Sequence, residues 1–179
     1  DAESGRTISR TAQPNFYYGL VFSADGSTLY ASGGETEVVY AFPFAKGYLA
    51  APRVLKVGEE KEQRVPCGLA LSPDGATIAV AESWGNAVTL LDEKSGAIKA
   101  RVNFDKETRP YDVRYLPDGK TLVASLWGGA GIAVIDTEKP DAAPRRVATG
   151  DVPNELAMTR DGARVFVSNA NINTISVID

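Results

Sequence analysis

The chain has 179 residues, a formal net charge of −4, a single cysteine and no histidine. This length suits one domain with a substantial core, and the acidic balance argues against a nucleic-acid partner, which requires a basic face. The lack of histidine excludes imidazole metal ligands and histidine-based proton transfer, although carboxylate or lysine chemistry survives it. Because the chain also carries no recognisable catalytic motif, we expect no metal, no cofactor and no catalytic residue. No run of 18 apolar residues is present, so no membrane-spanning helix is expected, and the N-terminus lacks the apolar segment of a signal peptide.

One short phrase recurs along the chain: an Asp-Gly turn, an alternating apolar strand, a loop and a second strand. The turn aspartates are spaced by 49, 44 and 43 residues (74−25, 118−74 and 161−118); they are Asp25, Asp74, Asp118 and Asp161. A period in the forties that contains only strand-like segments is typical of a β-propeller blade. We therefore predict an all-β fold, a β-propeller of four-stranded antiparallel blades with about four blade repeats.

The first predicted element is the outer strand of a split blade, within residues 1–13. Residues 1–5 match residues 92–96 in spacing and type, and an outer strand follows the latter, so residues 7–11 are expected to form one as well. The later units are predicted at 14–58 (blade one), 66–104 (blade two), 110–150 (blade three) and 153–179 (three strands of blade four). The first strand could complete blade four, in its own chain or another. We predict a closed four-blade ring, an eight-blade ring of two copies, or a chain that is part of a larger propeller, and we favour the last of these.

Blade two shows the pattern most clearly. Its four strands are predicted at Pro66–Ser72, Ala76–Ser83, Ala87–Asp92 and Ala97–Phe104. The first two are joined by a turn at Asp74 and Gly75. We interpret all four Asp-Gly pairs as turns rather than carboxylate sites, because Asp caps its own turn and Gly adopts a left-handed conformation easily.

The segments VFVSNANINTISVID (165–179) and ATIAVAESWGNAVTLLDEKSG (76–96) resemble bacterial YVTN-family β-propellers. The resemblance covers essentially the whole chain and implies a propeller of the surface-layer and lactonase-like kind. It also implies an exported protein at the periplasm or cell surface, used mainly as a repeat scaffold. The family phrase ends in Asn, which only the fourth repeat carries, as Asn169; its analogue in blade two is placed at Ser83.

A candidate ligand site lies where two sets of loops meet at one mouth of the channel. Loops from outer to next inner strand, and from second to third strand, are expected to emerge on the same face. The predicted binding residues are Tyr18, Arg64, Glu82, Trp84, Arg109, Tyr111, Asp112, Trp127, Glu155 and Asn169, with Tyr17, Cys67, Asn154 and Asn171 nearby. Aromatic rings beside charges at a concave mouth suit a small molecule or peptide. The alternative is that the rings pack between blades and the charges pair.

These features favour a non-catalytic propeller module that binds a partner or serves as a scaffold within a larger exported protein. Its partners would be the remainder of the propeller or a second copy of the chain, and a protein or small-molecule ligand. The alternative is part of a lactonase- or quinoprotein-like enzyme whose site uses Glu82, Asp112, Glu155 and Arg109. A third hypothesis is a cell-surface or adhesion element.

Overall fold

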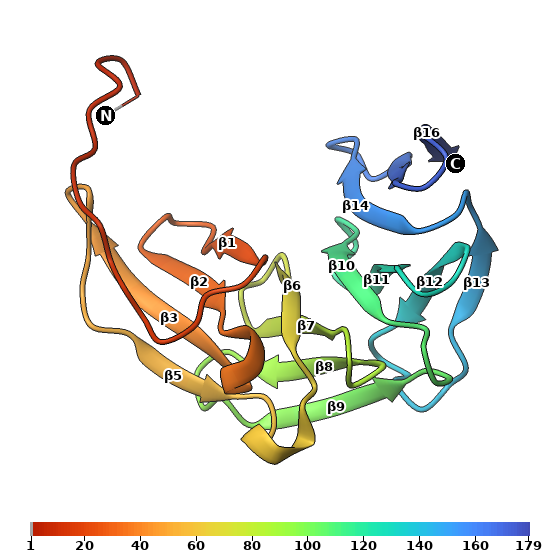
Figure 1. The fold of residues 1–179 in the computed structure, drawn as a ribbon, viewed down its shortest axis with the longest axis horizontal. Coiled ribbons are helices and arrows are strands. Elements are labelled where there is room, and N and C mark those ends of the chain that lie inside the picture. Colours follow the sequence, from red (N-terminus) through yellow and green to blue (C-terminus); the bar gives the residue numbers. More distant parts are fainter. Residues whose placement is uncertain (1) are drawn as a thin grey trace.

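The computed structural model describes residues 2–179, which form four antiparallel sheets arranged side by side as propeller blades (Figure 1). Blade one contains β1 (Leu20–Phe22), β2 (Thr28–Ser32), β3 (Val38–Ala45) and β5 (Arg53–Lys56), with β4 (Tyr48–Leu49) paired to the end of β3. Blade two contains β6 (Pro66–Leu71), β7 (Thr77–Glu82), β8 (Ala87–Asp92) and β9 (Ile98–Asn103). Blade three contains β10 (Pro110–Tyr115), β11 (Thr121–Leu126), β12 (Gly131–Asp136) and β13 (Arg145–Ala148), and blade four contains β14 (Pro153–Met158), β15 (Val165–Asn169) and β16 (Thr174–Ile178). The predicted all-β propeller fold is confirmed.

The four Asp-Gly pairs form the turns between the first and second strands of each blade. The glycines have φ values between 69° and 72°, in the left-handed region. Each aspartate Oδ1 accepts a backbone hydrogen bond from the residue two positions later, at 2.9–3.1 Å, the donors being Ser27, Ala76, Lys120 and Ala163. These carboxylates are therefore used in holding turns, as the sequence predicts.

The core lies between the blades, where neighbouring sheets pack face to face. Blades two and three share a cluster that includes Val88, Val113 and Leu122. The inner strands approach closely, because a Cβ atom at Gly68 would lie only 2.4 Å from the carbonyl oxygen of Tyr111. Close inner strands bring the loops of successive blades together at the mouth of the channel.

The ring is not closed within this chain. Blades one and four lie at the two ends of an arc, and the N-terminal arm extends from blade one (Figure 1). The predicted strand over residues 7–11 is not formed. Instead, Ser9 Oγ donates to the carbonyl oxygen of Gly47 at 3.0 Å, and Phe16 packs on the rings of Tyr40 and Phe42. In this structure the arm lies on the side of blade one, away from blade four (Figure 1), and residues 7–11 pair with no strand of the described chain. Completion of blade four by this segment, from its own chain or another, stays a prediction.

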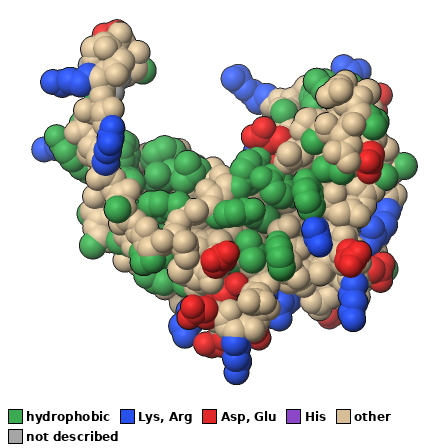
Figure 2. Space-filling view, viewed as in Figure 1, with side chains coloured by type: hydrophobic (Ala, Val, Ile, Leu, Met, Phe, Trp, Pro, Cys, Tyr) green, Lys and Arg blue, Asp and Glu red, His purple; other side chains and the backbone are tan. Residues whose placement is uncertain are grey.

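Hydrophobic side chains gather along the inner side of the arc, over blade one and the central blades (Figure 2). In the sequence from residue 2 onward, no helix has the length and apolar character needed to cross a membrane. The two short 3-10 helices, η1 (Gly34–Thr36) and η2 (Glu60–Glu62), lie in loops on the face that carries the candidate site.

Candidate functional site

The mouth of the channel is built by hydrogen bonds between the two predicted sets of loops. The residue before the first strand of blades two, three and four has a left-handed backbone, with φ values of 56°, 50° and 52° at Val65, Arg109 and Val152. Each of these carbonyl groups accepts an N–H from the turn after the second strand, from Ser83, Trp127 and Ala170 respectively, at 2.9–3.1 Å. The two loop sets thus meet on one face, which we call the mouth face. Left-handed residues before proline are strained, and such strain is often found at functional sites.

Three residues of the mouth face, two exposed tryptophans and one half-buried arginine, form a stack. The guanidinium carbon of Arg109 lies 5.8 Å from the ring centroid of Trp84 and 5.5 Å from that of Trp127, which is cation–π geometry. The side chains of Trp84 and Trp127 are 64% and 37% exposed. The backbone of Arg109 is fixed by donation from its N–H to Asn86 Oδ1 at 3.0 Å. We call these three residues the Trp–Arg stack; they contain both tryptophans of the chain.

A second group lies further inside the channel and joins blades that are distant in sequence. The rings of Tyr18 in the segment before β1 and Tyr111 in β10 are 4.7 Å apart. The pKa of the Tyr18 hydroxyl is raised by burial, by the charge of Asp112 and by a hydrogen bond with Glu155 of β14. The inner strands of blades one, three and four therefore meet here through side chains.

Asp112 of this group is buried and committed to the fold. Its Oδ2 accepts the backbone N–H of Leu156 at 3.0 Å, which ties blade three to blade four. Its Oδ1 accepts from Arg114 Nη1 at 2.8 Å and from the N–H of Val113 at 2.9 Å. Burial raises the pKa of this carboxyl, and the Arg114 charge opposes the rise. Little of the carboxylate is left to receive a ligand.

Glu82 is likewise an internal hub of charge. Its side chain is fully buried, and its carboxylate contacts Arg64 Nη1 at 3.0 Å and Arg101 Nε at 3.3 Å and accepts the Thr89 hydroxyl. Arg64 in turn pairs with Glu62 at 2.8 Å. The sequence analysis assigns Glu82 and Arg64 to the mouth of the channel. In the structure, their ion pair links the loop before β6 to β7, and Glu82 also contacts Thr89 of β8 and Arg101 of β9.

Strand pairing shows which residue is the counterpart of the family asparagine. The first residue of the inner strand pairs with Glu82 in blade two, with Leu126 in blade three and with Asn169 in blade four. The placement of the blade-two analogue at Ser83 is therefore wrong by one residue, because the strand register, and not the local resemblance of letters, sets the equivalence.

Asn169 acts as a brace in the same way as Glu82. Its Nδ2 donates to Ser176 Oγ, seven residues later, at 3.0 Å, and Glu82 accepts from Thr89, also seven residues later. Both side chains hold the second strand to the third. Asn169 is 2% exposed, and its Nδ2 is used by the fold, whereas its Oδ1 has no hydrogen-bond partner within residues 2–179.

The remaining residues near the mouth have structural contacts. Burial raises the pKa of the Cys67 thiol to about 12, and its Sγ contacts the carbonyl oxygen of Pro110 at 3.4 Å, so it is not a reactive cysteine. The Asn154 carbonyl accepts the Ser125 hydroxyl, and Asn171 Nδ2 donates to Asp151 at 3.2 Å. In the described part of the chain, no cluster of three or more His, Cys, Asp or Glu residues could hold a metal ion.

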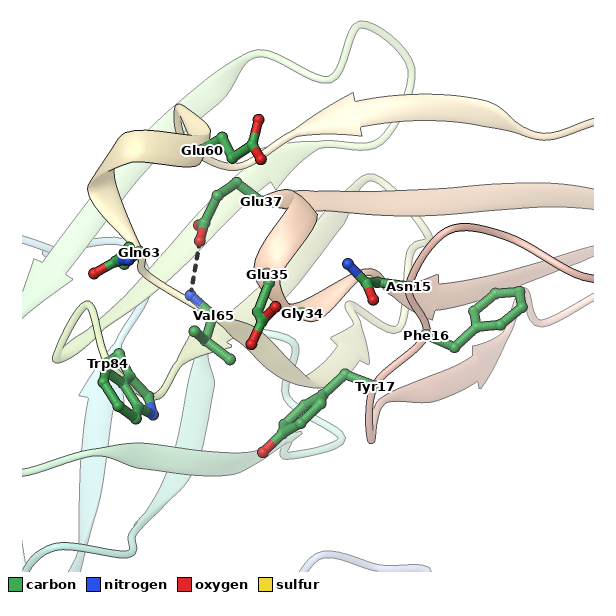
Figure 3. A pocket seen from close by; sticks show the side chains of 10 residues that line it. All are labelled: Asn15, Phe16, Tyr17, Gly34, Glu35, Glu37, Glu60, Gln63, Val65 and Trp84. Atoms are coloured by element: carbon green, nitrogen blue, oxygen red, sulfur yellow. Dashed lines mark hydrogen bonds between the residues drawn. The ribbon is translucent and has the colours of Figure 1, made fainter.

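The structure also shows a pocket that the sequence analysis missed. It lies on the mouth face between blades one and two, has a volume of about 610 Å³, and is lined by residues that include Tyr17, Glu35, Glu37, Glu60, Val65 and Trp84 (Figure 3). Only Tyr17 and Trp84 belong to the predicted set. The one sequence signal for it is the first repeat interval, which exceeds the second by five residues (49−44). The extra length marks additional loop structure, but not its chemistry.

Comparison with known proteins identifies the fold. No protein-family model matches the sequence, and no curated protein matches it either. Solved structures with a similar fold include Kuenenia stuttgartiensis hydrazine synthase (22% identity, TM-score 0.79, covering 98% of this chain and 49% of that one). Others are a putative 6-phosphogluconolactonase from Bacteroides uniformis (20%, 0.75, 89% and 49%) and the β-propeller domain of Myceliophteria thermophila Cps50 (Swd1) (17%, 0.73, 96% and 54%).

At these identities the similarity shows the β-propeller fold alone. The chain spans about half the length of these three structures.

Proposed function

We propose that this chain is a non-catalytic β-propeller module of the YVTN type that binds a partner at its mouth face, within a larger exported bacterial protein. The observation that carries the proposal is the exposed Trp–Arg stack. Tryptophan and arginine are the residues that most often dominate binding energy at protein interfaces. The Arg109 guanidinium lies within cation–π distance of both rings, and an arginine side chain can bind a carboxylate in a bidentate manner. The favoured ligand is an acidic peptide segment.

The state of the carboxylates supports binding over catalysis. Glu82 and Asp112, which an enzymatic site would need, are buried and already paired with arginines or backbone N–H groups. A carboxylate in that state has little capacity to act as a base or to hold a cation.

A lactonase-like activity is the second candidate, because two of its predicted residues stay accessible. Glu155 is exposed at the channel and Arg109 is partly exposed. A putative 6-phosphogluconolactonase is among the structures of similar fold. In such an enzyme, Arg109 would bind the anionic group of the substrate, and Glu155 would be the accessible carboxylate of the site.

Tryptophan fluorescence tests the proposal directly, because both tryptophans of the chain belong to the stack. Titration with the acetylated peptide Glu-Tyr-Glu should change the emission, and the Gln-Tyr-Gln peptide should bind more weakly. R109A should weaken binding about tenfold or more, as expected for a hot-spot residue. K120A, on the opposite set of turns, is the matched control. No difference between the peptides, or none between R109A and K120A, would contradict the proposal. Hydrolysis of 6-phosphogluconolactone that is lost in R109A and E155Q would favour the enzyme.

We further propose that other blades complete the ring, supplied by the remainder of a longer protein or by a second copy. Within residues 2–179, strand β16 pairs only with β15, and its residues Ile175 and Val177 are 68% and 58% exposed. An unpaired apolar strand edge readily accepts another strand. Residues 7–11 of a second copy are one segment that could occupy it.

A further inference from the structure

We propose that the pocket between blades one and two binds an organic ammonium ion, a primary amine on an aliphatic chain. Such a group occurs on a free alkylamine or on a lysine side chain of a peptide. This ligand and its site differ from those proposed for the Trp–Arg stack, although Trp84 borders both.

The first argument is the state of Glu37. This side chain is fully buried, and its Oε1 accepts the backbone N–H of Val65 at 3.1 Å. Its Oε2 has no hydrogen-bond partner within residues 2–179. Leaving a buried acceptor without a donor is unfavourable, so the site is complete only when a donor is added. Figure 3 shows this carboxylate between η1 and Val65, at the pocket.

The second argument is charge. The lining contains three glutamates, Glu35, Glu37 and Glu60, and neither lysine nor arginine. Arg64, which precedes the lining residue Val65 in the chain, is already paired with Glu62 and Glu82. Burial raises the pKa of Glu37, while Arg64 and two backbone N–H groups oppose the rise. A bound cation would stabilise the ionised carboxylate, whereas an anion would be repelled.

The third argument is the aromatic character of the walls. Tyr17 and Trp84 border the pocket and are 51% and 64% exposed, whereas the Phe16 ring turns away from it and packs on Tyr40 and Phe42 (Figure 3). Ring faces attract ammonium groups and pack against the methylene groups that carry them. A bare metal ion would instead need several oxygen ligands, and no cluster of three or more acidic or thiol groups fit for this is present in the described chain.

The fourth argument is the geometry of the lining. Four lining residues have φ values between 49° and 57°: Gly34, Glu37, Gln63 and Val65. Gly34 adopts this conformation at little cost. That of Val65 recurs at Arg109 and Val152, so the strain specific to the pocket lies in Glu37 and Gln63. Such strained positions persist where the surroundings define them closely, often at ligand sites. A volume of about 610 Å³ lies within the range of small-ligand pockets.

The test uses W127F, in which Trp84 is the sole tryptophan and reports on the pocket. Titration with pentylammonium should change its emission saturably, and 1-pentanol, of the same shape but neutral, should not bind. E37Q should weaken pentylammonium binding about ten- to hundredfold, the effect of losing a charged hydrogen bond. E35Q, at the exposed rim, is the matched control and should weaken it less than about fivefold. Comparing pentylammonium with N-acetyl-lysine-methylamide distinguishes a free amine from a lysine side chain.

A measurement on the wild-type chain protects the test against misfolding of E37Q. The carboxyl ¹³C resonance of Glu37 should shift on addition of pentylammonium. An unchanged resonance at concentrations that saturate Trp84, equal binding of pentanol, or unchanged affinity in folded E37Q would overturn the proposal. Acidic-peptide binding that survives in E37Q while amine binding is lost would separate this site from the Trp–Arg stack.

Discussion

Replacement of Glu82 by alanine should destabilise the fold strongly. The variant removes a fully buried carboxylate that lies between Arg64 and Arg101 and accepts the Thr89 hydroxyl. Both guanidinium groups then remain close together without the anion that separates them. Arg64 keeps its pair with Glu62, but Arg101 loses the carboxylate that it contacts, so the mutation leaves an uncompensated charge as well as a missing contact.

The structure sets the expected size of the effect. Removing one partner of a buried ion pair costs about 3–5 kcal/mol. The arginine side chains are 20% and 23% exposed, so water partly solvates them after the change. We therefore expect the lower end, about 3 kcal/mol, which for a chain of this size lowers Tm by about 6–12 °C.

Urea denaturation followed by circular dichroism measures this loss. E82Q keeps the side-chain volume and isolates the effect of charge. The matched control is E138A, which removes the partner of Lys120 from a surface pair whose side chains are 60% and 61% exposed, and should cost less than about 1 kcal/mol. If E82A were as stable as E138A, Glu82 would not be a structural hub. A stable E82A that lost ligand binding or turnover would restore Glu82 to the functional site.

Three further predictions concern the turns and the edges. G75A should lower the free energy of unfolding by about 1–2 kcal/mol, because alanine would have to adopt a left-handed conformation. G162A should lower it more in urea denaturation, because its Cβ would also lie 2.4 Å from Pro117 Cδ. Equal losses of stability in the two variants would contradict this. Hydrogen bonds from Ser23 and Ser27 lower the pKa of Asp25 to about 2, below its ordinary value of about 3.8. Its contribution is thus complete above about pH 4 and lost as the pH falls towards 2, so in thermal melts D25N should lose less stability than wild type over that interval. In sedimentation experiments, I175K should reduce any self-association through the edge of β16. Self-association that is unaffected by the new charge would show that this edge is not the contact between copies.

The blade pattern is predictable because its turn chemistry is local. An Asp that caps its own turn and a Gly that adopts positive φ need no distant partner, so the strands on either side follow from the neighbouring residues. Strand β7 is predicted at 76–83 and observed at 77–82. The segment at 7–11 has the composition of an outer strand, but it contacts the turn between β3 and β4 through Ser9 and Gly47 without pairing with a strand of residues 2–179, and a strand cannot form from composition alone.

The candidate site is harder to predict because burial and pairing depend on distant residues. Nothing near Glu82 in the sequence shows that Arg101, nineteen residues later (101−82), will reach it across the sheet. The orphan oxygen of Glu37 depends on left-handed residues in two loops, η1 and the segment before β6. The Trp–Arg stack is closer to prediction, since its three residues are assigned to the mouth face by loop position, although their stacking is not.

The strand register separates the residues that serve the repeat from those available for function. Glu82 and Asn169 occupy one repeat position, and both reach a hydroxyl seven residues later. In blade three this position is Leu126, which packs in the core, so the position serves the fold in all three blades. The tryptophans follow no such rule. By backbone hydrogen bonding Trp127 corresponds to Ser83 and Ala170, whereas Trp84 corresponds to Gly128. Two indoles at different repeat positions converge on one arginine, an arrangement that the repeat itself does not require; it is therefore the part of the mouth face on which a binding function is most reasonably placed.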